Sequence, residues 1–264
     1  QIKIRRCHSS LEKKLHHLAT VTREAEGAEE AKHLFKESQQ LAEAAESQLK
    51  TPYSRYQYNL AEFFTYQNRL RLKQHNHALF ASVVINPINA KNELNSLLKI
   101  EEKIDRYAES KQLDRIEVVN VARIKNLIAA CYIATKQIDC AKGKLNLLSK
   151  SFERLSQLNT HSAKEQLVLA SFYEAQVAIA TYDLTAADNS FQAAQKIVDQ
   201  MLPDFWDVPY YRSLICWYYG NFLHETGLRE TAMQVMQLGL TAAQQFTKYN
   251  VMNGKAILAA FTQT

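Results

Sequence analysis

A small residue followed four positions later by a large apolar residue recurs three times in the second half of the sequence, at spacings of 46 and then 45 residues. Positions four apart lie on the same face of an α-helix, because the helix completes a turn in 3.6 residues. The pairs are Ala141 with Leu145, Ala187 with Phe191, and Ala232 with Met236. This repeat predicts a series of similar helices, each with a closely packed face turned toward a neighbour.

A second set of small residues lies twelve positions before each of these alanines, at Ala129, Ala175 and Gly220. Small side chains on two consecutive helices let the helices approach closely. The same arrangement fits the N-terminal region, where Ala19 precedes Ala31 and Phe35. We therefore expect antiparallel helix pairs along most of the chain.

Glycine and proline are scarce, with six glycines and four prolines in 264 residues. Few turns imply long elements, which argues against the many short strands of a sandwich or barrel. The apolar share of 47% is ample for a packed core. The predicted fold class is all-α. The expected helices are 11–26, 28–50, 53–73, 86–111, the pairs 114–136 with 138–157, 161–182 with 184–202 and 208–226 with 228–248, and a last helix from about residue 252.

The recurring pattern resembles the tetratricopeptide repeat family, in which a small residue lies within the first helix, an alanine begins the second and an aromatic residue follows one turn later. The resemblance implies a right-handed superhelix of antiparallel helix pairs, an α-solenoid. The helices are long, because this repeat spans about 45 residues where the family's usual repeat has about 34. Residues 114–264 would form regular repeats with a capping helix. Residues 1–113 would form an N-terminal region of irregular pairs in the same continuous solenoid.

In tetratricopeptide repeat proteins the concave face holds a peptide, and asparagine amides bind its backbone. Carried onto this sequence, the resemblance implies a peptide- or protein-binding groove lined by Arg123, Asn126, Phe172, Gln176, Trp217, Asn221 and His224. An amide offers both a donor and an acceptor, so it can pair with an extended backbone. The alternative for Trp217 is that it packs against a neighbouring helix.

The sequence carries no familiar catalytic or phosphate-binding motif, such as GxGxxG, GxxxxGK[ST], GxSxG or HExxH. We therefore expect no catalytic residues, no metal site and no cofactor, and an all-helical enzyme is a third alternative. His75 and His77 could ligate a metal from a loop, although an ordinary polar bend is favoured there. The four cysteines are scattered, which favours reduced and buried thiols.

The net charge of +5 comes from 32 basic and 27 acidic residues that are mixed along the chain, and no nucleic-acid-binding module is evident. Specific nucleic-acid binding is therefore not expected. No apolar run reaches the ~18 residues of a membrane span, which favours a cytoplasmic protein. The chain begins at Gln1 without a methionine, so we expect a piece of a longer protein.

The favoured function is a helical-repeat scaffold that binds a protein or peptide segment, within the regulatory region of a larger bacterial-type signalling protein. Peptide-sensing regulators and diguanylate cyclases with repeat-containing input regions have this kind of architecture. A structural role is the alternative. In that case the chain forms a homodimer, for example through Ile257, Leu258 and Phe261, and the groove is filled by the chain's own segment 75–113.

Overall fold

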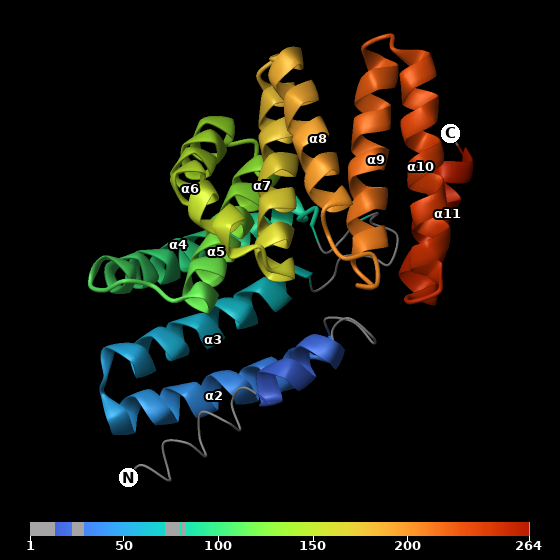
Figure 1. Ribbon diagram of the computed structural model, residues 1–264. Helices are drawn as coiled ribbons and strands as arrows, with labels where there is room; N and C mark the ends of the chain where they lie inside the picture. Colours follow the sequence, from blue (N-terminus) through green and yellow to red (C-terminus); the bar gives the residue numbers. More distant parts are fainter. Residues whose placement is uncertain (1–13, 23–28, 72–79, 81–82, 264) are drawn as a thin grey trace. The chain divides into compact units, whose positions relative to one another are not determined.

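The computed structural model describes residues 14–22, 29–71, 80 and 83–263, and within them every regular element is a helix (Figure 1). The chain divides into two compact units, each taken by itself below. Unit 1 comprises Gln1–Lys73 and Ile85–Thr135. Unit 2 comprises Gln74–Val84 and Lys136–Thr264. The prediction of an all-α fold is confirmed for the described part of the chain.

Where it is described, unit 1 has a helical stretch at 14–22 and four longer helices. Each of the four packs against the next along the chain. These are α2 (Lys32–Leu49), α3 (Pro52–Arg71), α4 (Pro87–Glu109) and α5 (Arg115–Ala134). Helix α3 buries apolar side chains at helical spacing, namely Tyr56, Leu60, Phe63, Phe64 and Leu70. The core of unit 1 therefore follows the period of the apolar residues in the sequence.

Two helices of unit 1 begin at side chains that cap them. The side chain of Asn86 accepts a hydrogen bond from the Ile88 N–H at 2.8 Å, and Pro87 occupies the first turn of α4. Proline suits this place because its missing N–H has no partner within the helix. At the start of α5, Asp114 and Glu117 each accept a hydrogen bond from the other's backbone N–H, which forms a capping box.

The described residues of unit 2 form six helices, and each packs against the next along the chain. They are α6 (Ile138–Leu158), α7 (His161–Ala180), α8 (Leu184–Asp199), α9 (Val208–Glu225), α10 (Arg229–Thr247) and α11 (Val251–Gln263). Helices α7 and α8 lie antiparallel and side by side, as do α9 and α10 (Figure 1). The two predicted pairs of unit 2 are thus present with nearly the expected bounds.

The recurring small residues lie inside the packed faces of these helices. Ala129, Ala141, Ala175, Ala187, Gly220 and Ala232 are all buried. At Gly220 a Cβ atom would come within 2.8 Å of the Met236 side chain, so the missing bulk on α9 is filled by the large residue of α10. The prediction that small residues permit close helix packing is confirmed.

A second repeated feature, which the sequence analysis missed, ends the first helix of each predicted pair. Thr135, Thr181 and Thr226 are the C-cap residues of α5, α7 and α9, at the same spacings of 46 and 45. Each threonine hydroxyl donates to the carbonyl four residues earlier, at 2.9 to 3.0 Å. The next residue in each case has positive φ, a conformation that ends a helix: Lys136 at 60°, Tyr182 at 59° and Gly227 at 87°.

The contacts assign residues 85–135 to unit 1 and residues 136–264 to unit 2, and the division at residue 113 between irregular and regular repeats stays a prediction. Helix α5 belongs to unit 1 because it packs on α4, where Lys125 bonds to Glu101 and Asp105. The described helices that follow belong to unit 2, beginning with α6. The right-handed superhelix stays a prediction.

Candidate functional site

The predicted groove residues of α5 lie in different environments. Asn126 is 1% exposed and belongs to the buried side of its helix. Arg123 is half-buried, and its guanidinium carbon lies 5.8 Å from the centre of the Phe64 ring. Its Nη1 also donates to Asn120 Oδ1 at 3.5 Å. Asn126 is thus enclosed within unit 1, whereas part of the Arg123 side chain is accessible to solvent.

The predicted aromatic groove residues of unit 2 pack against other helices. Phe172 on α7 is 2% exposed, and its ring centre lies 5.0 Å from that of Tyr218 on α9. Trp217 on α9 is half-buried, 5.1 Å from the Phe261 ring of α11. Phe172 and Trp217 are 45 residues apart, so they occupy the same position in two consecutive repeats. Each contacts an aromatic ring on the second helix after its own, α9 for Phe172 and α11 for Trp217. The geometry matches the alternative in which Trp217 packs against a neighbouring helix.

The predicted polar groove residues of unit 2 differ in accessibility. Gln176 is half-buried, and its Nε2 is buried without a hydrogen-bond partner among the described residues. Asn221 donates from Nδ2 to the Trp217 carbonyl of its own helix at 2.8 Å. His224 is exposed near the end of α9. Ligand binding by these residues stays a prediction.

A different face of α7 and α9 already carries a piece of polypeptide. Three tyrosines, Tyr173 on α7 with Tyr210 and Tyr218 on α9, form what we call the tyrosine face. The ring of Phe80 lies on it, with its centre 5.7 Å from the Tyr210 ring and 6.3 Å from the Tyr218 ring. Phe80 is only 2% exposed, so its ring is enclosed within unit 2.

The tyrosine face also binds the main chain of this piece. The Tyr173 hydroxyl donates to the Val83 carbonyl at 3.0 Å in a buried hydrogen bond. The piece is a turn rather than a helix or strand, because the Phe80 carbonyl accepts from the N–H groups of Val83 and Val84 at 2.8 and 2.9 Å. The face therefore combines aromatic contact for a side chain with a hydroxyl donor for a backbone carbonyl.

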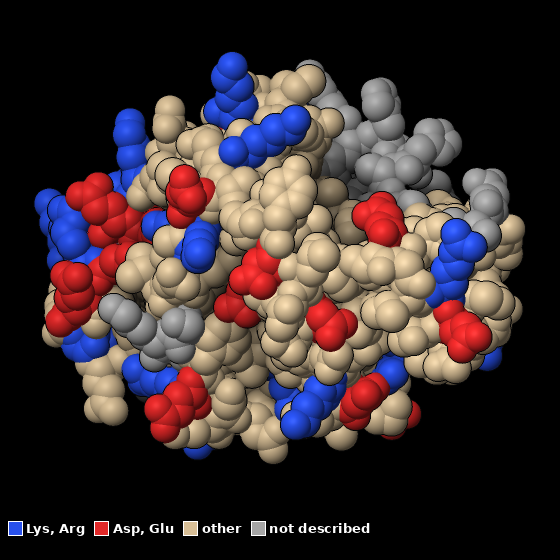
Figure 2. All heavy atoms as spheres, turned by 90° about the horizontal axis from the view of Figure 1, so that it is seen from above, with Lys and Arg blue, Asp and Glu red and all other residues tan. Residues whose placement is uncertain are grey.

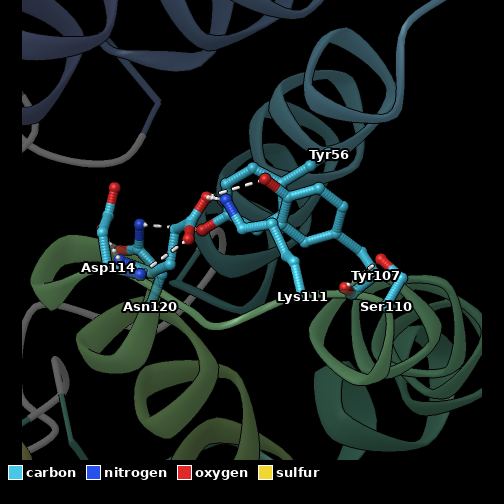
Figure 3. Close-up of polar contacts among 7 residues, drawn as sticks. Tyr56, Tyr107, Ser110, Lys111, Asp114 and Asn120 are labelled. Atoms are coloured by element: carbon cyan, nitrogen blue, oxygen red, sulfur yellow. Dashed lines mark hydrogen bonds and ion pairs between the residues drawn. The ribbon is translucent and has the colours of Figure 1, made fainter.

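A polar cluster of unit 1, whose members Tyr107, Lys111 and Asp114 are labelled in Figure 3, surrounds the buried carboxylate of Glu117. One oxygen, Oε1, accepts from the Tyr107 hydroxyl at 2.8 Å and from Lys111 Nζ at 2.9 Å. The other, Oε2, accepts from the Asp114 N–H at 2.9 Å. The Tyr107 ring stacks on Tyr56 at 4.5 Å. Because both oxygens of Glu117 are occupied, this cluster joins α3, α4 and α5 rather than offering a ligand site.

Replacing Glu117 with glutamine should lower the free energy of unfolding by about 1–3 kcal/mol at pH 7. Burial would raise the pKa of Glu117, but hydrogen bonds from Lys111, the Asp114 backbone and Tyr107 outweigh it and hold the pKa below its ordinary 4.5. As the pH falls below 4.5, Glu117 takes up a proton in the unfolded chain before it does so in the native protein. The stabilisation from the ionised Glu117 is therefore fully present above pH 4.5 and is lost as the pH falls through the lower native pKa.

Urea unfolding of the wild type and Glu117→Gln between pH 3 and pH 7 measures this effect. The difference in stability should shrink as the pH falls below 4.5. Glu102→Gln is the matched control, because Glu102 pairs with Arg106 on the exposed side of α4. A Glu117→Gln difference that stays constant over the whole range would contradict the assignment.

Two other titratable positions have features seen in catalytic sites. His161 Nε2 lies 2.9 Å from both carboxylate oxygens of Asp207, and its ring stacks on Phe205 at 3.9 Å. Burial raises the pKa of Glu174 to about 6, which suits acid–base chemistry. No nucleophile is bonded to either group among the contacts found in the described residues. The positions do not make up a catalytic set.

Among the described residues, the overall charge pattern and the metal-binding side chains point to neither a nucleic acid nor a metal ion. On the surface drawn in Figure 2, basic and acidic side chains are interspersed, without the broad basic stripe typical of nucleic-acid binding. Where side chains can be placed, no group of three or more His, Cys, Asp or Glu residues could hold a metal ion. His75 and His77 lie outside the described residues. Cys131 and Cys216 are buried free thiols, and Cys140 is exposed.

None of the helices in the described ranges is both long enough and apolar enough to cross a membrane. Comparison with known proteins adds no assignment. No family model, no curated protein and no solved structure matches this chain.

Proposed function

We propose that unit 2 is a helical-repeat module that binds a protein segment on the tyrosine face. One observation carries the proposal: the turn at Phe80 and Val83 already lies on this face, held by ring contacts and by the hydrogen bond from Tyr173 to the Val83 carbonyl. A surface that holds one irregular piece of polypeptide has the chemistry to hold another. By analogy of architecture, we place the module in the regulatory part of a longer signalling protein.

The chemistry of the face suits a protein ligand. Tyrosine offers a large apolar ring with few rotatable bonds, so contact area forms at a low cost in conformational entropy. Its hydroxyl can donate to any main-chain carbonyl, whatever the side chain of that residue. Helix pairs packed through small residues hold Tyr173 and Tyr218, which are 45 residues apart, on consecutive first helices. Helical-repeat proteins commonly use the surfaces formed by their stacked helices for binding.

Selection of random dodecapeptides displayed on phage tests the proposal. The purified full chain and its Phe80→Ala variant both serve as bait, because Phe80 itself lies on the face. We expect enriched peptides whose binding weakens about 2- to 12-fold in Tyr173→Phe, which corresponds to the loss of one hydrogen bond. Replacement of Tyr218 with alanine should weaken binding further, because it removes an aromatic contact.

The controls separate this face from the other candidates. Met233→Ala changes an exposed residue of α10 and should leave binding intact. Loss of binding in His224→Ala but not in the tyrosine variants would place the ligand in the groove predicted from the sequence. If no peptide is enriched on either bait, the proposal fails, and the turn at Phe80 has only the structural role of filling the chain's own surface.

A further inference from the structure

A cavity of about 90 Å³ opens in unit 2 where α8 and α10 both pack on α9 (Figure 1). We infer that this cavity binds a free α-amino acid with a branched aliphatic side chain. None of the residues that line it belongs to the tyrosine face. The inference therefore does not rest on the proposed function.

The floor of the cavity is apolar. Val198 of α8 and Ile215 of α9 are buried there, and Leu238 of α10 lines the cavity from the other side. Cys216, which follows Ile215, is a free thiol. Burial raises the pKa of this thiol to about 11, so it carries no charge at neutral pH. An uncharged floor of this kind favours an aliphatic group over a polar one.

The volume of the cavity limits the size of that group. In another protein, a buried apolar cavity of about 150 Å³ holds a benzene molecule. A cavity of about 90 Å³ is much smaller, so it suits the side chain of valine, isoleucine or leucine better than an aromatic ring. Two of the lining residues, Asp199 and Leu238, are exposed. A ligand can therefore enter from solvent without unfolding the helices.

The rim of the cavity carries one charge of each sign. Arg212 Nη1 on α9 donates to Asp199 Oδ1 on α8 at 2.6 Å, and the two side chains are 36% and 60% exposed. Among the contacts of the described residues, this pair uses one guanidinium N–H and one carboxylate oxygen. The second carboxylate oxygen and the other guanidinium N–H groups are therefore able to bind a ligand.

Adjacent charges of opposite sign select the polar end of the ligand. An α-amino acid carries its ammonium and its carboxylate on the same carbon atom, so the ammonium reaches Asp199 while the carboxylate reaches Arg212. A simple amine or carboxylic acid gains only one of these contacts and meets a like charge at the other side chain. The amide of Gln195, which also lines the cavity, offers a further donor and acceptor. Rim and floor together define a zwitterion with an aliphatic side chain.

An NMR titration of the full chain, isotope-labelled at the methyl groups of isoleucine, leucine and valine, tests the inference. L-leucine should shift the methyl signals of Ile215 and Val198, with a dissociation constant of about 1 mM for a ligand of this size. Leucine amide and isocaproate each lack one of the two charges, so they should bind at least about fivefold more weakly. L-tryptophan should cause no shift at these methyl groups, because its ring exceeds the cavity.

Two variants assign the charged groups. Arg212→Met should abolish the preference for L-leucine over leucine amide, because the carboxylate loses its partner. Asp199→Asn should abolish the preference for L-leucine over isocaproate, because the ammonium loses its partner. Arg229→Met is the matched control, since it changes an exposed arginine of α10 that does not line the cavity, and it should leave all three affinities unchanged.

The ligand series on the wild-type chain decides the inference even if a variant does not fold. Unshifted methyl signals of Ile215 and Val198 with L-leucine at about 20 mM would overturn the site. Equal affinity for L-leucine and leucine amide would overturn the ligand class, because the cavity would then recognise an amine alone. Neither result changes the outcome of the phage selection on the tyrosine face, so the two proposals fail separately.

Discussion

Replacement of Lys125 with methionine is expected to lower the free energy of unfolding by about 3–5 kcal/mol. Lys125 Nζ lies 3.2 Å from Glu101 Oε1 and 2.8 Å from Asp105 Oδ2, and both Lys125 and Glu101 are almost fully buried in unit 1. Burial would lower the pKa of Lys125, but hydrogen bonds and charge from Asp105 and Glu101 outweigh it and raise the pKa. The methionine variant removes the ammonium group that pairs with the buried Glu101 carboxylate.

Urea unfolding at pH 7 measures this change in the free energy of unfolding. Two further variants show whether the change comes from the buried ion pair. In Arg106→Ala, which removes the exposed pair with Glu102, the change should stay within about 0.5 kcal/mol. Adding Glu101→Leu to Lys125→Met should recover most of the lost stability, because it also removes the buried Glu101 carboxylate. A single Lys125→Met variant as stable as the wild type would show that the ion pair contributes nothing to unit 1.

Gly239→Ala should lower the free energy of unfolding by about 1–3 kcal/mol through overpacking. A Cβ atom at this position of α10 would come within 2.5 Å of the Phe261 ring of α11 and within 2.7 Å of Cys216 Cβ on α9. The three helices therefore meet at a point where only a hydrogen atom fits. Any accommodation has to move the Phe261 ring, which also contacts Trp217.

Gly143→Ala on α6 is the matched control, because a Cβ there meets nothing within 4 Å. Both glycines lie inside helices, so alanine should favour both helices by about 0.5–1 kcal/mol. Thermal or urea unfolding should show the Gly143 variant stabilised and the Gly239 variant destabilised. Equal shifts in the two variants would mean that α9, α10 and α11 do not pack as closely as described.

The helices could be predicted from the sequence because their signals are local. Thr51 and Pro52 separate α2 from α3, and Asn86 with Pro87 begins α4. The small residues could also be placed on packed faces, because the 46- and 45-residue spacings repeat the same local arrangement. Prediction succeeded for the individual helices and for the pairs α7 with α8 and α9 with α10, whereas α5 and α6, predicted as a pair, belong to different units.

The site depends on contacts between distant parts of the chain, which the repeat does not encode. Tyr173 and Val83 are 90 residues apart, and nothing near either residue indicates that they meet. Adjacent helix positions differ in direction by about 100°. The repeat predicts a groove at Phe172 and Trp217, which pack on other helices, whereas the face we propose lies at their neighbours Tyr173 and Tyr218. The recurrence of tyrosine one position later was the available signal.

The burial of polar residues in unit 1 could not be predicted from the sequence either. Asn126 and Lys125 lie on α5 among apolar residues, and a polar residue in such a stretch is normally assigned to the surface. Lys125 is buried because Glu101 and Asp105 on α4 provide its partners. Such pairing depends on how two helices face each other, so it could be found only from the structure.

The contact between Phe80 and the tyrosine face is the central claim, and nuclear Overhauser effects measure it directly. A deuterated sample of the full chain with protonated phenylalanine and tyrosine reports only aromatic contacts, and Phe80→Leu assigns the Phe80 signals. The account predicts cross-peaks from the Phe80 ring to the rings of Tyr210 and Tyr218. A Phe80 ring with no cross-peak to either tyrosine would contradict the account.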